Sequence, residues 1–461
     1  MAPSLVEVLP GKLHWAPEHA TAPAGFEGEL KHALDLVMYT TEGDRKAFGT
    51  GYNVMHYSAK AAGRAFGPLG IDIVLRFCRG LRTRLANDSR PLAVGTAPDD
   101  PDQRSNIAVI FGAYLLLVGA WSVDDIAAKL GASDAEAGFV VSWARKDRPE
   151  PKRNMTVRDC WDGLAMGLKM GWIDAGCLES DTATDYICKK WREWVATYDC
   201  SWVIPGFIVV GADPTTTALD PNPSTFKQVF PADTPTTAAS TETGVQLEFP
   251  DGEVKKGTSA SDVKRVNTPG SGASAGSLHS VCKEYRTALD AAPLLLDSKP
   301  LDFMTFMKNI GVSTMVRTNF HNEPGMPPNG GYDANKLKAY GIGHVDILIV
   351  DMHGGLPKRL DVQKLLKTCP NGRTANGAVY IHCKGGFGRS IVLACCLAIE
   401  RLDIPGAALL GWVRMVRPGC VNTPQQELML KGFKGSKDVR RFAALPPGGE
   451  DESPKCGCTL Q

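Results

Sequence analysis

The chain has 461 residues, a length greater than one hydrophobic core usually serves. Of these residues, 43% are hydrophobic. Its 51 lysines and arginines are balanced by 50 aspartates and glutamates, so no excess charge draws the whole molecule onto nucleic acid or an acidic membrane. We therefore expect two globular domains and no nucleic-acid partner. Any charge selectivity must be local.

The cysteines and the first residues favour a cytoplasmic or nuclear location. The 13 cysteines are an odd number spread along the chain, and the opening MAPSLVEVLPGK lacks the apolar segment of a secretory signal. We expect free thiols in a reducing compartment. The longest apolar run, residues 107–121, is shorter than the roughly 20 residues that span a bilayer, so it predicts a buried helix.

The first half alternates segments with helical and strand-like spacing, as mixed α/β domains do. Helices are expected over 70–85, 107–121, 156–172 and 182–199, and strands over 91–96 and 201–211. We place the junction between the domains at the last of these strands.

The second half opens with a segment of low complexity. Residues 213–277 are rich in Thr, Ser, Pro, Gly and Ala and cannot bury enough surface to offset their ordering entropy, so we expect a surface insertion. Repeated αβ units follow and predict a mostly parallel sheet flanked by helices. The expected helices cover 301–311 and 360–369, and the expected strands cover 312–319, 345–355 and 377–383.

The stretch YIHCKGGFGRS, residues 380–390, lies between the last of these strands and the apolar run IVLACCLAIERL, which has helical spacing. A loop in this position directs backbone N–H groups and a helix N-terminus at one point, which makes an anion site. Gly385, Gly386 and Gly388 allow the tight curvature of such a cradle. We expect it to bind a phosphate group.

The side chains of this loop predict nucleophilic chemistry on that phosphate. The dipoles of the cradle stabilise the thiolate of Cys383, which makes it a nucleophile. Arg389 offers two parallel donors to phosphoryl oxygens, Ser390 can donate to the thiolate as it leaves, and Lys384 adds positive charge. We assign His382 the lesser role of supporting the loop.

Two other interpretations fit this loop less well. A nucleotide-binding P-loop needs Gly-Lys-Ser/Thr at its end, whereas Gly-Arg-Ser stands here behind a cysteine. The alternative of a buried structural cysteine beside a glycine turn leaves the arginine and the following helix unexplained. Cys395 and Cys396 lie on the apolar face of that helix and are expected in the core. No Cys/His cluster has metal-ligand spacing, and we expect neither a metal nor another cofactor.

Cys-x5-Arg preceded by His and followed by Ser resembles the signature of the protein tyrosine phosphatase superfamily. Six further segments resemble one branch, the mitotic-exit, cell-division-cycle-fourteen family of dual-specificity phosphatases. They are FGPLGIDIVLRFC, DQRSNIAVIFGAY, YDCSWVIPG, TMVRTN, HVDILIVD and GWVRMVRPGCVNTPQQ. The likeness covers roughly residues 35–435, interrupted by the insertion.

This resemblance implies an α/β fold of tandem dual-specificity-phosphatase-like domains, each a central mostly parallel sheet flanked by helices. The implied order is an N-terminal phosphatase-like domain over 30–184, a linker helix over 185–200, a catalytic domain over 201–440 and a flexible tail over 441–461. In the first domain Arg104 stands at the equivalent place, but no cysteine precedes it, so this half cannot form a phosphocysteine.

The resemblance also implies the partners of Cys383 in catalysis. A general acid must protonate the departing alkoxide, and the family places it at Asp351, after the strand VDILIV. Asp346 is the rival carboxylate but fits a surface residue of that strand, and His353 is the second choice. A glutamine that positions the hydrolytic water is expected at Gln425 or Gln426.

Substrate preference is implied in the same way. Phe387 stands where phosphoinositide phosphatases of the superfamily carry a second lysine, which favours phosphorylated proteins as partners. The family prefers phosphoserine followed by proline and a downstream basic residue, which acids of the linker helix bind. Glu193 and Asp199 retain such acids, whereas Lys190 replaces one, so we expect a weakened preference for downstream basic residues.

The last residues fit a lipidation pattern. Cys458-Thr-Leu-Gln has the form of a farnesylation site, and Cys456 is placed for a second, palmitoyl chain. One lipid anchors only marginally, so both cysteines would be needed for a membrane tether. The acidic GEDES upstream stands where a basic patch would help.

The sequence therefore predicts a cysteine-dependent phosphatase that hydrolyses phosphoserine, phosphothreonine and phosphotyrosine through a phosphocysteine. The competing class is a phosphate-binding scaffold with weak turnover. A third interpretation, redox signalling through Cys383, follows from the same thiolate and can coexist with catalysis.

Overall fold

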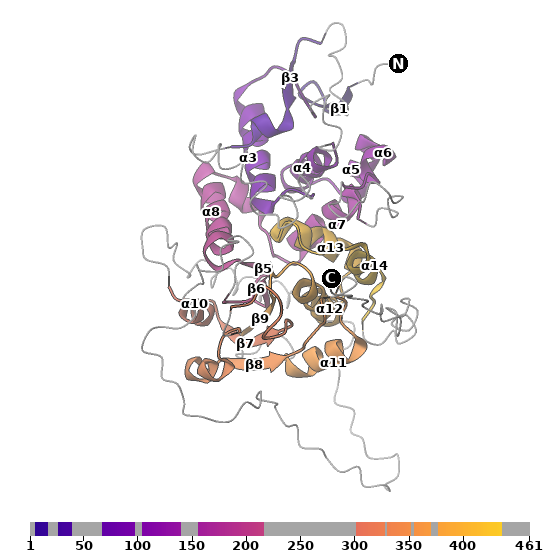
Figure 1. Ribbon diagram of the computed structural model, residues 1–461. Coiled ribbons are helices and arrows are strands. Elements are labelled where there is room, and N and C mark those ends of the chain that lie inside the picture. The colour runs from indigo at the N-terminus through magenta and orange to yellow at the C-terminus, as the bar shows by residue number, and fades with distance from the viewer. Residues whose placement is uncertain are drawn as a thin grey trace, which may run out of the picture.

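The structure is a computed structural model, shown in Figure 1. The residues that it describes are 5–16, 26–38, 67–96, 104–139, 155–215, 301–327, 330–351, 355–369 and 377–435. Among their helices, none is long and apolar enough to cross a membrane.

The first half forms a four-stranded sheet with helices packed against it, in the upper part of Figure 1. The strand order is β1-β2-β4-β3, with β2 and β3 parallel to β4 and β1 antiparallel to β2. The strands are β1 (Val6–Leu9), β2 (Leu13–Ala16), β3 (Glu29–His32) and β4 (Leu92–Gly95). The helices are η1 (Ala33–Leu36), α3 (Ile71–Asn87), α4 (Arg104–Leu117), α5 (Val123–Leu130), α6 (Ala132–Ala135) and α7 (Val157–Lys169).

The second half builds a five-stranded sheet, in the lower part of Figure 1, with the order β5-β6-β9-β7-β8. All pairs of adjacent strands in this sheet are parallel except β5 with β6, which are antiparallel. The strands are β5 (Cys200–Ile204), β6 (Ile208–Ala212), β7 (Val312–Arg317), β8 (Gly343–Asp346) and β9 (Ala378–Cys383). Between the two halves lie η3 (Ala175–Leu178) and α8 (Asp181–Tyr198), which pack against α3. The helical segments of the second half are α10 (Phe303–Asn309), η4 (Ala334–Tyr340), α11 (Arg359–Thr368), α12 (Arg389–Leu402), α13 (Gly406–Val416) and α14 (Pro424–Gly432).

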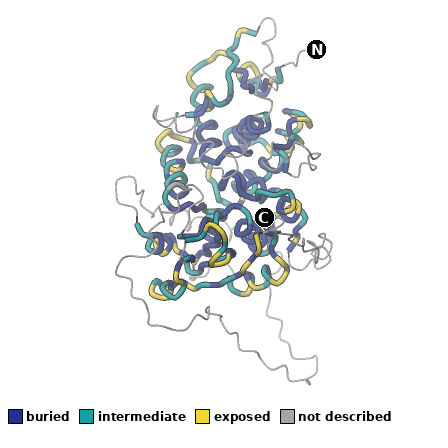
Figure 2. Tube along the Cα trace, in the orientation of Figure 1, coloured by how far each residue is buried: buried dark blue, intermediate teal, exposed yellow. Residues whose placement is uncertain are grey.

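Burial follows the apolar patterns in the sequence (Figure 2). Every residue of α4 after Arg104 is buried, which confirms the expected buried helix, although it ends at Leu117 and not at residue 121. Strand β9 lies in the middle of its sheet with all six residues buried, which matches the unbroken apolar run of a parallel strand covered on both faces. Cys395 and Cys396 are buried on α12, as expected. The prediction of an α/β fold with two mostly parallel sheets is confirmed.

Two expected strands differ from the structure. Residues 201–211 form a hairpin of the antiparallel strands β5 and β6, because Gly206, with φ of +69°, turns the chain back. The strand expected over 345–355 ends at Asp346, and the residues after it follow β7 as an extended segment, since Ile347 N donates to the Arg317 carbonyl oxygen.

The domain limits stay a prediction, although some elements extend past them. Strands β1 and β2 precede residue 30, where the first domain was expected to begin. Helix α8 occupies Asp181–Tyr198 in place of the predicted linker range 185–200. Asp213, the first residue of the predicted insertion, is fully buried beside the loop that follows β9.

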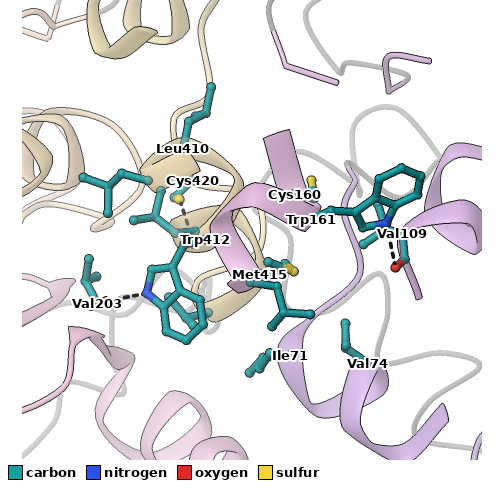
Figure 3. Packing of buried hydrophobic residues seen from close by; sticks show 14 of the residues in the cluster. Ile71, Val74, Val109, Cys160, Trp161, Val203, Leu410, Trp412, Met415 and Cys420 are labelled. Carbon is teal, nitrogen blue, oxygen red and sulfur yellow. Dashed lines mark hydrogen bonds between the residues drawn. The ribbon is translucent and has the colours of Figure 1, made fainter. Parts of the chain in front are cut away.

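The two halves meet where α7 packs against α13, in the middle of Figure 1. Their backbones approach closely, since a Cβ atom added to Gly411 would lie 2.1 Å from the Asp159 carbonyl oxygen. Around this contact the buried side chains of both halves form one cluster (Figure 3). Trp412 of α13 donates from Nε1 to the carbonyl oxygen of Val203 in β5 at 2.8 Å. This bond fixes α13, and with it the contact between α7 and α13, to the second sheet.

The close approach predicts that Gly411→Ala destabilises the fold. The added methyl group has no room against the backbone of α7, so we expect the free energy of unfolding to fall by about 1–3 kcal/mol. Gly432→Ala is the matched control, because a Cβ atom at this helical glycine meets nothing within 4 Å. Urea unfolding followed by circular dichroism measures both. Equal stability of the two variants would contradict the packing described here.

Candidate active site

The predicted catalytic loop joins the central strand of the second sheet to a buried helix. Cys383 ends β9 and is 4% exposed, whereas Arg389 begins α12 and is 2% exposed. The thiol of Cys383 and the guanidinium of Arg389 therefore stand at the two ends of a five-residue loop, at the carboxyl edge of a parallel sheet. Ligand sites of open α/β sheets lie at this edge.

The loop has its carbonyl groups turned outward and held there. Each carbonyl oxygen from residue 384 to residue 387 accepts a hydrogen bond from the surrounding protein. The pairs are Asp213 N to Lys384 O at 3.1 Å, Arg417 Nη2 to Gly385 O at 3.1 Å, Arg417 Nε to Gly386 O at 2.8 Å and Val421 N to Phe387 O at 2.7 Å. Because the N–H of a trans peptide points opposite to its C=O, the N–H groups of residues 385–388 face the inside of the loop. Convergent N–H groups of this kind form an anion-binding nest.

Val421, which donates to the Phe387 carbonyl oxygen, has an unusual backbone conformation. Val421 has φ of +53°, which is a genuine outlier for a β-branched residue. Both its backbone groups are held, because its N–H donates to Phe387 and its carbonyl oxygen accepts from the buried Arg414. Backbone strain of about 1–3 kcal/mol persists only where the surroundings fix it, and it is found at functional sites.

The thiol of Cys383 lies inside the cradle. Gly386 N donates to its Sγ at 3.1 Å, and Ser390 Oγ donates to the same sulfur at 3.3 Å. Gly386 has φ of +72°, and a Cβ atom there would lie 2.4 Å from the backbone of Gly211. Only glycine fits at this position, so Gly386 is the one loop glycine whose conformation and surroundings both require it.

Arg389 is oriented by a carboxylate that sequence reasoning missed. Its Nη1 and Nη2 donate to the two carboxylate oxygens of Glu323, each at 2.7 Å, and Nη1 also donates to the Ile349 carbonyl oxygen at 3.2 Å. Burial opposes the charge of Arg389, but the bonds to Glu323 hold its pKa above the ordinary value. Both hydrogens of Nη1 are thus engaged, which leaves the edge formed by Nε and Nη2 to meet two phosphoryl oxygens.

The loop that carries Glu323 also holds the lysine of the cradle. Lys384 Nζ donates to the Pro324 carbonyl oxygen at 2.7 Å, so its ammonium group faces this loop. One signal in the sequence pointed to Glu323, since it is the only carboxylate between Arg317 and Asp333. Nothing in the spacing of the two segments showed that Glu323 and Arg389 meet.

Asp351 reaches the cradle and Asp346 does not. Asp351 Oδ2 lies 3.3 Å from Arg389 Nη2, and the Asp351 side chain is 68% exposed. Asp346 instead binds Arg317 through both carboxylate oxygens, at 2.7 and 3.0 Å. The rival carboxylate is thus a structural partner of β7, while His353 lies outside the described residues.

The structure separates the two candidate glutamines. Gln426 is 2% exposed, and its Nε2 would lie 3.0 Å from a Cβ atom at Gly388. Gln425 is exposed on the outer side of the first turn of α14. Gln426 alone of the pair is therefore in reach of the catalytic loop.

Two of the three residues expected in a substrate groove are buried, and the third, Glu193, is partly exposed. Asp199 is 1% exposed, and its carboxylate accepts from Arg417 at 3.0 Å. Lys190 is 5% exposed, with its ammonium group 5.4 Å from the ring of Tyr186. The substrate contacts of these two residues stay a prediction, and burial of both side chains counts against it. Glu193 is half-buried on α8.

Phe387 also turns away from the cradle. It is 5% exposed, and the guanidinium of Arg417 lies 4.5 Å from its ring. The inference from Phe387 to a phosphoprotein therefore rests on the absence of a second lysine, because its ring is packed beneath the loop.

His382 is supported by Tyr332, which in turn contacts His344, and sequence reasoning missed both residues. The hydroxyl of Tyr332 lies 2.9 Å from His382 Nε2 and 3.0 Å from His344 Nε2. Burial lowers the pKa of each histidine to about 4, so both rings are neutral at pH 7. A buried neutral ring bonded to Tyr332 is suited to the supporting role predicted for His382.

The equivalent arginine of the first half has a structural role. Arg104 begins α4 as Arg389 begins α12, but Arg104 Nε donates to Asp134 Oδ1 at 2.6 Å. Asp134 is 1% exposed and also accepts from Trp15 Nε1 at 3.0 Å. This arginine stabilises the first domain by linking α4 to α6 and β2.

The structure describes too little of the chain to test the predictions on lipidation and on metals. Cys456 and Cys458 lie outside the described residues, so lipidation stays a prediction. Among the residues with described side chains, no group of three His, Cys, Asp or Glu could hold a metal ion.

The buried histidines predict that acid destabilises the fold. The unfolded rings gain a proton near pH 6.5, whereas the folded rings stay neutral down to about pH 4. The unfolded state binds more protons between these values, so stability is full above pH 6.5 and is lost as the pH falls toward 4. From pH 7 to pH 5 we expect a loss on the order of 2 kcal/mol per histidine in urea unfolding.

His344→Phe tests this assignment, because it removes one of the two titrating rings. The loss of stability between pH 7 and pH 5 should be clearly smaller in this variant than in the native chain. A native chain that is equally stable at both pH values would refute the burial of neutral histidines behind the catalytic loop.

Comparison with known proteins points to one group of phosphatases. The family model for the N-terminal half of dual specificity protein phosphatases matches residues 40–167. Tyrosine-protein phosphatase cdc-14 of Caenorhabditis elegans is 25% identical over 376 residues, which cover 80% of this chain and 40% of that protein. Dual specificity protein phosphatase CDC14A of Homo sapiens is 22% identical over 367 residues, which cover 79% of this chain and 46% of that protein.

Other similarities cover shorter stretches. Human CDC14C is 32% identical over 171 residues, which cover 33% of this chain and 35% of that protein. A crystal structure of PTPMT1 in complex with PI(5)P aligns at 20% identity with a TM-score of 0.26, over 32% of this chain and 90% of that one. The chain spans less than half the length of the curated relatives it matches. Over about four fifths of its own length it is nevertheless similar to CDC14 phosphatases, which confirms the resemblance expected from its sequence.

Proposed function

We propose that this chain is a cysteine-dependent protein phosphatase that hydrolyses phosphate monoesters through a phosphocysteine. One observation carries the proposal. The four carbonyl groups of residues 384–387 are held outward, so their peptide N–H groups converge beside the sulfur of Cys383. Such a cradle suits an oxyanion with three equatorial oxygens and places a nucleophile at its base. The similarity to proteins named dual specificity and tyrosine-protein phosphatases supports the same chemistry.

In the first step the Cys383 thiolate attacks phosphorus and the bond from phosphorus to the ester oxygen breaks. Arg389 binds two phosphoryl oxygens along its Nε–Nη2 edge, while Glu323 keeps the guanidinium in place. Asp351, on the exposed rim of the cradle, gives its proton to the leaving oxygen. The product alcohol leaves and the phosphoryl group stays on sulfur.

In the second step water attacks the phosphocysteine. Asp351 takes the proton of that water, the phosphorus–sulfur bond breaks, and inorganic phosphate and the thiolate are formed. Ser390 Oγ, 3.3 Å from the sulfur, stabilises the departing thiolate by donating a hydrogen bond. Gln426, packed beside Gly388, orients the water.

The substrates that we propose are proteins phosphorylated on serine or threonine before proline, and on tyrosine. The similarity to dual-specificity phosphatases supports both classes of phosphoryl ester. Selection of a downstream basic residue should be weak, because Lys190 and Asp199 are buried and only Glu193 of the three is partly exposed on α8.

Steady-state hydrolysis of phosphopeptides tests this function. The panel compares phosphoserine-proline with phosphotyrosine peptides on the native chain, Cys383→Ser and Asp351→Asn. We expect Cys383→Ser to abolish turnover because the nucleophile is lost. Asp351→Asn should lower kcat by about 10²- to 10⁴-fold, which is the usual contribution of a general acid.

The same panel separates the proposed enzyme from a phosphate-binding scaffold. Native protein that binds these peptides but releases no phosphate would be a phosphopeptide reader. Full activity of Cys383→Ser would exclude the phosphocysteine.

The buried glutamine gives a second prediction. Gln426→Ala should slow hydrolysis of the phosphocysteine by about tenfold or more, because the attacking water loses its orientation. Rapid-mixing kinetics should then show a burst of released alcohol followed by slow turnover. Gln425→Ala is the matched control and should behave as the native chain. A burst in the Gln425→Ala variant alone would reverse the assignment.

A further inference from the structure

We propose that Arg417 and Asp199 form a positioning pair, which fixes the peptides of the catalytic loop from behind and ties them to the end of helix α8. The proposal rests on the proposed function and adds two residues to it. It also gives Asp199 a role other than the substrate contact expected from the sequence.

Arg417 is built into the back of the loop. It is 2% exposed, and it donates from Nε to the Gly386 carbonyl oxygen at 2.8 Å and from Nη2 to the Gly385 carbonyl oxygen at 3.1 Å. Its guanidinium lies 4.5 Å from the ring of Phe387, at a distance typical of a cation–π contact. A single side chain thus contacts three successive loop residues.

These contacts act on the nucleophile through one peptide group. The peptide between Gly385 and Gly386 has its carbonyl oxygen on Arg417 and its N–H on Cys383 Sγ, at 3.1 Å. A cation at the oxygen end of a peptide polarises it and strengthens the donor at the other end. Rotation of this peptide would break both bonds, so Arg417 fixes the direction in which the N–H points.

Asp199 holds Arg417 in this position. Its Oδ1 accepts from Arg417 Nη2 at 3.0 Å, and both side chains are almost fully buried. Asp199 is the residue that ends α8, with φ of +49° and ψ of 45°, a left-handed conformation that aspartate tolerates better than most residues. Its carbonyl oxygen accepts from Ala212 N at 3.1 Å, which anchors the turn to β6.

The carboxylate of Asp199 is needed as the partner of the buried Arg417. An arginine without a partner is strongly unfavourable in a buried site, so removal of the carboxylate would release or misplace Arg417. A residue in this role affects every substrate equally, because it acts on the cradle. A residue that reads a downstream basic side chain affects only substrates that carry one.

The test uses Asp199→Asn and Arg417→Lys in the full chain. Lysine keeps the charge but cannot bond two carbonyl oxygens and a carboxylate in one plane. Asp181→Asn is the matched control, since Asp181 lies at the other end of α8 and pairs with Arg79 at 2.6 Å. Circular dichroism and urea unfolding check that each variant is folded. If Arg417→Lys does not fold, Asp199→Asn carries the test.

Two readouts are compared in each variant. The first is kcat and KM on two phosphoserine-proline peptides that differ only in a downstream lysine. We expect both Asp199→Asn and Arg417→Lys to lower kcat by about a hundredfold on both peptides, since displaced catalytic geometry costs about that much. Asp181→Asn should match the native chain. A rise in KM confined to the lysine peptide in Asp199→Asn would overturn the proposal and restore the substrate contact.

The second readout does not depend on turnover. Tungstate, a phosphate-like oxyanion, should protect Cys383 of the native chain from alkylation by iodoacetamide. We expect protection to need at least about tenfold more tungstate in the two variants, because the N–H groups no longer converge. Unchanged protection in both would refute the positioning pair, even in a chain that releases no phosphate. Absence of turnover with normal protection in the native chain would instead count against the proposed function alone.

Discussion

The outward anchoring of four carbonyl groups is the constraint on which the rest of the site depends. A five-residue loop has no secondary structure of its own to set the direction of its peptides. Here hydrogen bonds from Asp213, Arg417 and Val421 set it, and the N–H groups converge as a consequence. The thiol of Cys383 and the Nε–Nη2 edge of Arg389 can act on one phosphate only because this cradle lies between them.

This constraint gives the first half, which has no cysteine at the place before Arg104, a part in holding the loop. Arg417 and Val421 follow directly after α13, and α13 is packed onto α7 of the first half through a glycine contact. Lys431 of α14 also pairs with Asp159 of α7 at 2.9 Å. The first half therefore supports the residues after α13 that hold the loop, Arg417 and Val421. Its own arginine, Arg104, is bound by Asp134.

The sequence predicted the contacts between residues adjacent in the chain, but it did not predict the contacts between distant segments. The strand, the glycine loop and the helix around Cys383 are adjacent in the chain, so spacing alone predicted their arrangement. Glu323, Tyr332 and Arg417 meet this loop only through tertiary contacts, and no pattern within their own segments showed it. The substrate contact expected of Asp199 came from the resemblance, and nothing in the sequence showed that its carboxylate meets Arg417.

The most direct test of this account is a crystal structure of the native chain with tungstate. We expect the oxyanion to lie within hydrogen-bond distance of the backbone N–H groups of residues 385–388. It should also lie on the Nε–Nη2 edge of Arg389, with Glu323 and Arg417 still bonded as described. Tungstate bound elsewhere, or loop carbonyl groups turned inward around it, would contradict the claim that this loop is a preformed oxyanion cradle.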